Sequence, residues 1–224
     1  MQLGFWRKKS HSYMKYKKIY PRKIITIFSN LLPQQILQSF YFSLAFINDF
    51  VGSNEVATKD QPLIKKIKDF VFATFALPLA LDVSILFWSL YAMDRRSVFP
   101  DELDSFFPSW LNHILHTNIA IFVIIELIVL HRNYPARKES LTAIALFMSC
   151  YLIWLHITRY YAGKWTYPIL DTLDVPGKIL FMAFISAFLF SMYFLGEFLN
   201  RKVWNASRIE KCTSENNETF TRKI

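Results

Sequence analysis

The sequence predicts an all-α protein, a polytopic transmembrane helical bundle with about five spans. The mean hydropathy of the chain is +0.23, and 53% of its 224 residues are hydrophobic whereas only 19% are charged. Five stretches hold almost no Asp, Glu, Lys or Arg, and roughly 20 apolar residues can cross a bilayer as a helix. These stretches are 24–48, 70–93, 105–125, 140–158 and 179–196. We therefore expect an integral, multi-pass protein of an endomembrane or the plasma membrane.

The positive charge of the chain indicates contact with lipid head groups rather than with nucleic acid. The formal net charge is +9, but the basic residues lie in connectors and tails, where anionic head groups are the nearest anions. We expect the bilayer and a lipid substrate as partners and no nucleic acid, and the oligomeric state stays open. Cys150 and Cys212 are too few for a disulfide framework.

Residues 1–23 are a basic, aromatic N-terminal arm. The arm contains eight Lys or Arg residues and no acidic residue, interleaved with Phe, Trp and Tyr. An apolar run begins only at Ile24 and no small-residue cleavage site follows, so we expect the arm to be retained. It is either a solvated tail or an anchor in the membrane interface. Residues 24–204 are the predicted transmembrane helical bundle, and residues 205–224 are a polar C-terminal tail.

The first span, residues 24–48, is unusually polar for a helix in lipid. Polar side chains in the hydrocarbon need hydrogen-bonding partners within the protein. We therefore expect this helix to turn its polar residues toward the neighbouring helices. The residues concerned are Thr26, Ser29, Asn30, Gln34, Gln35 and Gln38.

Ionisable side chains lie at membrane depth in the later spans. A charge there is costly, so such a side chain should point into the bundle and pair with another group. Asp82 in the second span and Glu126 in the third are candidates for function, and a structural hydrogen bond within the bundle is the alternative for each. The second to fifth spans are expected at residues 70–93, 114–130, 140–161 and 179–199.

The connectors between the spans are short and leave no room for a separate soluble domain. Trp165, Tyr167 and Pro168 suit the membrane interface. Five spans put the two ends of the chain on opposite sides of the membrane. The loop cations favour a cytoplasmic C-terminus and the cations of the arm favour a cytoplasmic N-terminus, so the orientation stays open.

The densest group of polar residues is the block Trp110–Thr117, which contains His113 and His116. Two histidines three residues apart lie on one face of a helix. They could bind zinc or iron if a third ligand joined them, with His131, His156 or Glu126 as the choices. The chain has only five histidines, so we expect no metal and no cofactor.

One histidine of this block could instead act as a general base for a hydroxyl nucleophile. Desolvation disfavours a charged imidazole at membrane depth, and a neutral imidazole is the form that takes a proton from a hydroxyl. Thr26 and Ser29 of the first span are the candidate hydroxyls. The alternative is that the histidines only cap the helix. The G-x-S-x-G motif of α/β-hydrolases does not occur in the chain.

Six short blocks of sequence, in order along the chain, resemble the androgen-induced protein family, which includes the androgen-dependent TFPI-regulating protein. The resemblance covers roughly residues 24–204. One such block is weak by itself, whereas six in register are specific. The blocks are Phe87–Arg95, Trp110–Thr117, Tyr134–Arg137, Leu141–Ile144, Gly163–Pro168 and Leu195–Asn200.

The resemblance implies a multi-span membrane hydrolase that cleaves fatty acid esters of hydroxy fatty acids. It also implies a threonine nucleophile in an early span and a histidine base at the position of His116. The threonine position is occupied by Ile27, with Thr26 one residue away and Ser29 two, and a gap would bring Thr26 into register. The family's additional apolar span at the start is replaced by the basic arm. Glu126 matches a family acid, whereas Asp82 falls where the family has an apolar residue.

We therefore predict an intramembrane carboxylic ester hydrolase of the threonine type. Thr26 would attack the ester carbonyl, with Ser29 as the alternative nucleophile, and His116 would take the proton. The alternative function is a non-catalytic membrane protein that binds lipid or regulates a partner. A transporter is a weaker third choice, because the spans show no paired halves. The predicted supporting residues are Asn30, Asn112, His113 and Glu126.

Overall fold

The structure, a computed structural model, describes residues 33–52, 61–99 and 107–221, with side chains described as far as Trp204. This part of the chain is helical and contains no strand, so the predicted all-α class is confirmed. The first helix is described over residues 33–51. Helix α2 (Leu63–Val71), the π-helical turn η1 (Phe72–Ala76) and α3 (Leu77–Met93) then follow one another without a break.

Three further long helices complete the described bundle. The elements α4 (Ser109–His113), η4 (Ile114–Asn118) and α5 (Ile119–Val129) are continuous, and α6 and α8 are single helices. Four helices of the described part are long and apolar enough to cross a membrane: Leu63–Met93, Ser109–Val129, Arg137–Ala162 and Val175–Trp204. The chain is an integral, multi-pass membrane protein, as predicted. The remaining bounds are η2 (Arg95–Ser97), α6 (Arg137–Ala162), α7 (Ile169–Thr172) and α8 (Val175–Thr221).

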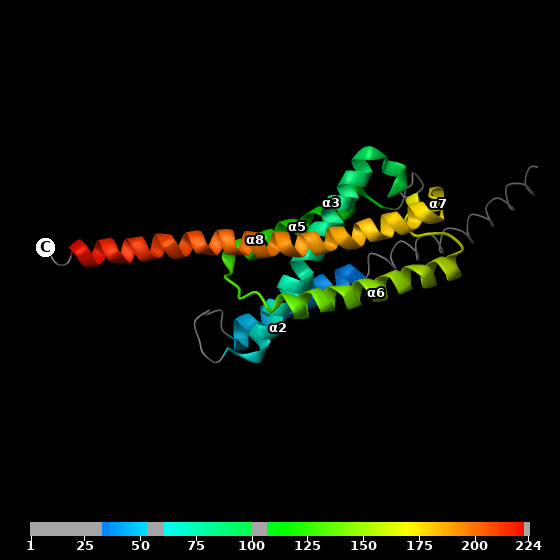
Figure 1. Cartoon of the computed structure of the whole chain (residues 1–224). Coiled ribbons are helices and arrows are strands. Elements are labelled where there is room, and N and C mark those ends of the chain that lie inside the picture. Colours follow the sequence, from blue (N-terminus) through cyan, green and yellow to red (C-terminus); the bar gives the residue numbers. More distant parts are fainter. Residues whose placement is uncertain (1–32, 53–60, 100–106, 222–224) are drawn as a thin grey trace, which may run out of the picture.

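The helix Leu63–Met93 lies at the centre of the bundle. Its most apolar stretch is 67% buried, against 22–28% in the other three spans. Helix α3 packs on α8, α5 and η4, and η1 packs on α6 (Figure 1). The outer helices carry exposed apolar side chains that suit contact with lipid. They include Ile121, Ile125, Ile128, Ile179, Leu180, Phe184 and Phe198.

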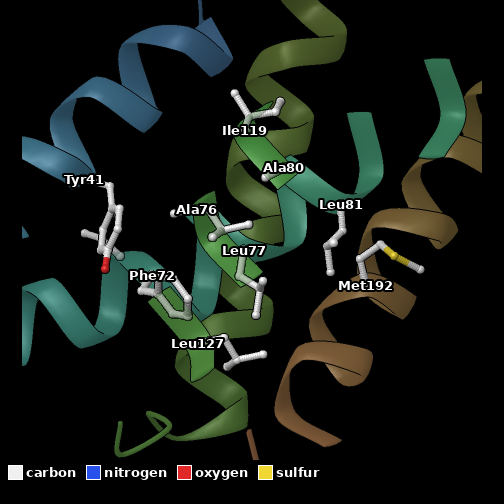
Figure 2. Close-up of a cluster of buried hydrophobic side chains, with 11 residues drawn as sticks. Tyr41, Phe72, Ala76, Leu77, Ala80, Leu81, Ile119, Leu127 and Met192 are labelled. Carbon is white, nitrogen blue, oxygen red and sulfur yellow. The ribbon is translucent and has the colours of Figure 1, made fainter. Parts of the chain in front are cut away.

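One hydrophobic cluster joins the central helix to its neighbours (Figure 2). Phe72, Ala76, Leu77, Ala80 and Leu81 come from the central helix. The two alanines are fully buried, and small side chains allow helix backbones to approach closely. The partners from the other helices are Tyr41, Ile119, Val123, Leu127 and Met192.

The π-helical turn η1 precedes Pro78, which lies in the first turn of α3. Proline has no backbone N–H and its ring disturbs the preceding turn of a helix, so the hydrogen-bond pattern there must change. Gln38 Nε2 donates a hydrogen bond of 2.8 Å to the carbonyl oxygen of Ala76 in this turn. The described part of the first span therefore directs a polar side chain into the bundle, as predicted.

The second span begins earlier than the sequence predicts. The charge-free stretch starts near residue 70, but the helix starts at Leu63 and includes Lys65, Lys68 and Asp69 as buried residues. Lys65 Nζ lies 3.0 Å from the Asp69 carboxylate. Paired charges are tolerated inside a bundle, and for that reason a search for charge-free stretches misses this end of the helix. At the other end of the chain, α8 continues past residue 204 to Thr221.

Gly196 lets α8 approach both α3 and the loop before α6. A Cβ atom at this position would lie 2.8 Å from Leu77 Cδ2 and 2.9 Å from the Tyr134 hydroxyl oxygen. We expect Gly196→Val to lower the free energy of unfolding by about 1–3 kcal/mol, the usual effect of overpacking. The measurement is unfolding of the purified protein in mixed detergent micelles. Gly163→Ala is not a suitable control because Gly163 has a φ of 76°, which other residues rarely adopt. Ala145→Val on the outer helix α6 is the control, and it should change the free energy of unfolding little because Ala145 is exposed.

Candidate functional site

The side chain of His116 is held in one orientation by Asn112, four residues earlier on the same helix. His116 Nδ1 lies 3.1 Å from the Asn112 carbonyl oxygen and 2.8 Å from Asn112 Oδ1. A backbone carbonyl oxygen only accepts hydrogen bonds, so Nδ1 carries the hydrogen and donates it. The lone pair of the neutral ring is therefore on Nε2. This is the nitrogen that can take a proton from a substrate or a nucleophile.

The helix around His116 has the π-helical form, and the ring stacks on Phe87 of α3. The two ring centres are 3.6 Å apart and the planes differ by 9°. Only 5% of the His116 surface is exposed. π-helical turns are frequent at functional sites because they change where one side chain points. His116 lies seven residues after the start of α4, or about 10 Å along a helix long and apolar enough to cross a membrane.

A cavity of about 140 Å³ lies beside His116. Its walls come from the first helix, α3, the residue after η2, η4, α6, the loop before α7, α7 and α8, and they are mostly apolar. A cavity of about 150 Å³ is large enough for a benzene ring, so this one has room for an organic group of about that size. The apolar wall includes Leu79, Leu86, Phe147, Leu155, Phe181 and Leu189.

Four further polar side chains line the same cavity: Gln34, Asp82, Tyr151 and Tyr167. The hydroxyl groups of Tyr151 and Tyr167 are 2.8 Å apart. Burial raises the pKa of the Tyr167 phenol, its hydrogen bond with Tyr151 lowers it, and the Asp82 carboxyl raises it again. Tyr167 therefore stays a neutral hydrogen-bonding group close to Asp82.

Two polar atoms of this cavity lack a partner in the described part of the protein. They are Gln34 Nε2, a donor, and Asp82 Oδ1, an acceptor, and both are buried. Buried polar atoms are nearly always hydrogen-bonded. The cavity therefore offers one donor and one acceptor to a bound molecule.

The predicted nucleophiles Thr26 and Ser29, and the supporting residue Asn30, lie outside the described residues. Pro33 and Gln34, which follow them in the same predicted span, line the cavity with His116. The structure therefore brings the first span, the histidine and Asn112 to one place. Sequence reasoning singled out Asn112 but did not find its bond to His116, although a spacing of four residues is the signal for such a contact.

His113 lies away from the cavity wall. Its Nδ1 is 3.1 Å from the Thr117 hydroxyl oxygen, and its ring stacks on Trp88 at 5.0 Å. Trp88 Nε1 donates a 3.0 Å hydrogen bond to the same hydroxyl. His113 thus joins α3 to η4 at the exposed end of the block. Within the described ranges, no three His, Cys, Asp or Glu residues gather as metal ligands do.

Glu126 belongs to a different cluster, at the far end of α5. It accepts hydrogen bonds of 2.6 Å from both the Tyr41 hydroxyl and Arg132 Nη2. Arg132 is 1% exposed, and its guanidinium group lies 3.7 Å from the centre of the Phe72 ring. Arg132 Nη1 is also 3.7 Å from Asp69 Oδ1. Glu126, predicted as a supporting residue, is therefore placed with structural partners and does not line the cavity.

The chain matches a known protein family over most of its length. A family profile described as "FAR-17a/AIG1-like protein" matches residues 20–201. The chain is 32% identical over 180 residues to a Homo sapiens protein named androgen-induced gene 1 protein, covering 77% of this chain and 75% of the relative. It is 34% identical over 171 residues to the Mus musculus androgen-dependent TFPI-regulating protein, covering 76% and 74%. No solved structure matches the chain at a significant level.

Proposed function

The chain belongs to the FAR-17a/AIG1-like protein family, and on that basis we propose that it is an intramembrane hydrolase of lipid esters. The substrates are fatty acid esters of hydroxy fatty acids, which the family resemblance suggests. The observation that carries the proposal is the buried His116, with Nδ1 bonded to Asn112 at the edge of an apolar cavity. A neutral imidazole held in one orientation at the edge of an apolar cavity is an arrangement suited to general-base catalysis.

The proposed reaction has two steps and one covalent intermediate. In the first, the Thr26 hydroxyl oxygen attacks the ester carbonyl carbon while His116 Nε2 takes the hydroxyl proton. The C–O bond of the ester breaks, and the alcohol product leaves with that proton. In the second step, water attacks the acyl-threonine and His116 again takes a proton. The fatty acid is released and the Thr26 hydroxyl is restored. Ser29 is the alternative nucleophile.

Gln34 is the proposed donor to the oxyanion that forms during both steps. Its Nε2 is buried, lines the cavity and has no partner among the described residues. A donor fixed in an apolar site stabilises developing negative charge more than water does. Asn112 is less suited to this role because it does not line the cavity.

The nucleophile can be identified by covalent labelling of the full chain in membranes with a fluorophosphonate probe. We expect Thr26→Ala to reduce labelling to below about a tenth of the wild-type level, because the probe reacts with the activated hydroxyl. Ser29→Ala is the matched control and should label normally. Loss of labelling in Ser29→Ala alone would move the nucleophile to Ser29. Normal labelling in both variants would contradict a nucleophile in the first span.

The alternative of a non-catalytic lipid-binding or regulatory protein makes the opposite prediction. It gives no probe labelling in the wild type and no ester turnover. The same experiment therefore separates the two functions.

A further inference from the structure

We propose that Asp82 determines specificity by accepting a hydrogen bond from a hydroxyl group of the bound lipid. Among lipid esters, one that carries a free hydroxyl a few carbon atoms from the ester group is then bound more tightly than one whose hydroxyl groups are all esterified, as they are in the simple fatty acid esters of hydroxy fatty acids. That such a lipid is cleaved rests on the proposed hydrolase function, whereas its binding does not.

Asp82 is a buried carboxyl group on the wall of an apolar cavity. It is 6% exposed, and no described residue donates a hydrogen bond to its Oδ1 atom. The side chains of Leu79, Val83 and Leu86 surround it on the same helix and line the same cavity. A polar atom left unpaired in such surroundings costs free energy. A ligand that supplies a hydrogen-bond donor at this point removes that cost.

The neighbours of Asp82 favour a hydroxyl group over an amine as the donor. The mutual hydrogen bond between Tyr151 and Tyr167 uses one of the two phenol hydrogens. No described residue is seen to accept a hydrogen bond from the other phenol hydrogen of this pair. A lipid hydroxyl can accept a hydrogen bond from that phenol and donate its own hydrogen to Asp82. An ammonium group donates only, and it also brings a charge into the membrane.

The position of Asp82 also fixes how far the hydroxyl lies from the ester. Asp82 and His116 line one cavity of about 140 Å³. Because the cavity has room for only a few carbon atoms beside the ester, the hydroxyl and the ester must be close together on the lipid. Longer acyl chains would extend between the helices.

The test measures binding to the full wild-type chain in nanodiscs, with two ether lipids that cannot be hydrolysed. The lipids have the same chain length, and one carries a hydroxyl group near the ether oxygen. Each competes with a photoreactive fatty acid probe, and the labelled protein is measured on a gel. We expect the hydroxylated lipid to halve labelling at about a tenth of the concentration that the plain lipid needs. Asp82→Leu should bring the two concentrations together, and Asp82→Asn should keep part of the preference.

Ser84→Ala is the matched control, because Ser84 lies two residues further along the same helix, is buried and does not line the cavity. It should keep the full preference. Equal displacement by the two lipids in the wild type, displacement by neither, or a full preference in Asp82→Leu would overturn the proposal. A preference that depends on Asp82 in a protein without ester turnover would uphold this inference and contradict the hydrolase function.

Discussion

Replacing His116 with alanine should lower kcat/KM for a fluorogenic lipid ester by roughly 100-fold or more, the scale expected for loss of a general base. The variant lacks the Nε2 atom that takes the hydroxyl proton in the proposed mechanism, and no other described histidine lines the cavity. The loss should appear mainly in kcat, because the apolar walls of the cavity, the proposed binding site for the lipid, remain. The measurement is steady-state turnover by purified protein in nanodiscs.

His156→Ala is the control for this prediction. His156 also lies in a membrane span, but it is exposed and its Nδ1 is bonded to the Leu152 carbonyl oxygen at 2.8 Å. Its replacement should leave turnover within about twofold of the wild type. Equal losses in the two variants would point to a general effect on folding. Unchanged turnover in His116→Ala would remove the base from the mechanism.

Arg132→Leu should have the largest effect on stability, with a loss of about 3–5 kcal/mol in the free energy of unfolding. The guanidinium group lies 2.6 Å from Glu126 and 3.7 Å from Asp69. Without it, the carboxylates of Glu126 and Asp69 have less positive charge near them. Lys65 remains beside Asp69, so Glu126 should bear most of the loss. The measurement is unfolding in mixed detergent micelles.

A matched control for Arg132 is Arg137, which also pairs with a glutamate but from the surface. Arg137 Nε lies 3.0 Å from Glu197, and the arginine side chain is 58% exposed. Arg201 pairs with the same carboxylate. Because an exposed partner is easily replaced by water, Arg137→Leu should have a much smaller effect than Arg132→Leu. Similar effects would mean that burial of the Arg132 cluster does not contribute to stability.

Much of the fold follows from the distribution of charge along the chain. The apolar stretches 140–158 and 179–196 lie within α6 and α8, and the stretch 70–93 lies within the central helix. A search for stretches without charge places the start of the central helix about seven residues too late, because Asp69 interrupts the charge-free stretch. Whether a charge ends a helix or is buried depends on its partner. Arg132, which approaches Asp69, is far away in the sequence.

The site follows from the sequence only where its residues are close along the chain. Asn112 and His116 are four residues apart, so one helical turn brings them into contact. Phe87 and Asp82 of α3 line the same cavity as His116. They lie on a different helix, and no pattern in the sequence predicts that they lie near His116. Glu126 is a predicted supporting residue because it is an ionisable side chain at membrane depth and matches an acidic residue of the family. In the structure Glu126 pairs with Arg132 and does not line the cavity.

The most direct test of the proposed function is the fate of one defined lipid. An intact fatty acid ester of a hydroxy fatty acid is incubated with the purified chain in nanodiscs, and the products are quantified by mass spectrometry. We predict that the wild type releases the fatty acid and the hydroxy fatty acid in equal amounts, and that His116→Ala releases almost none. Recovery of the intact ester from wild-type protein that binds it would contradict the hydrolase function.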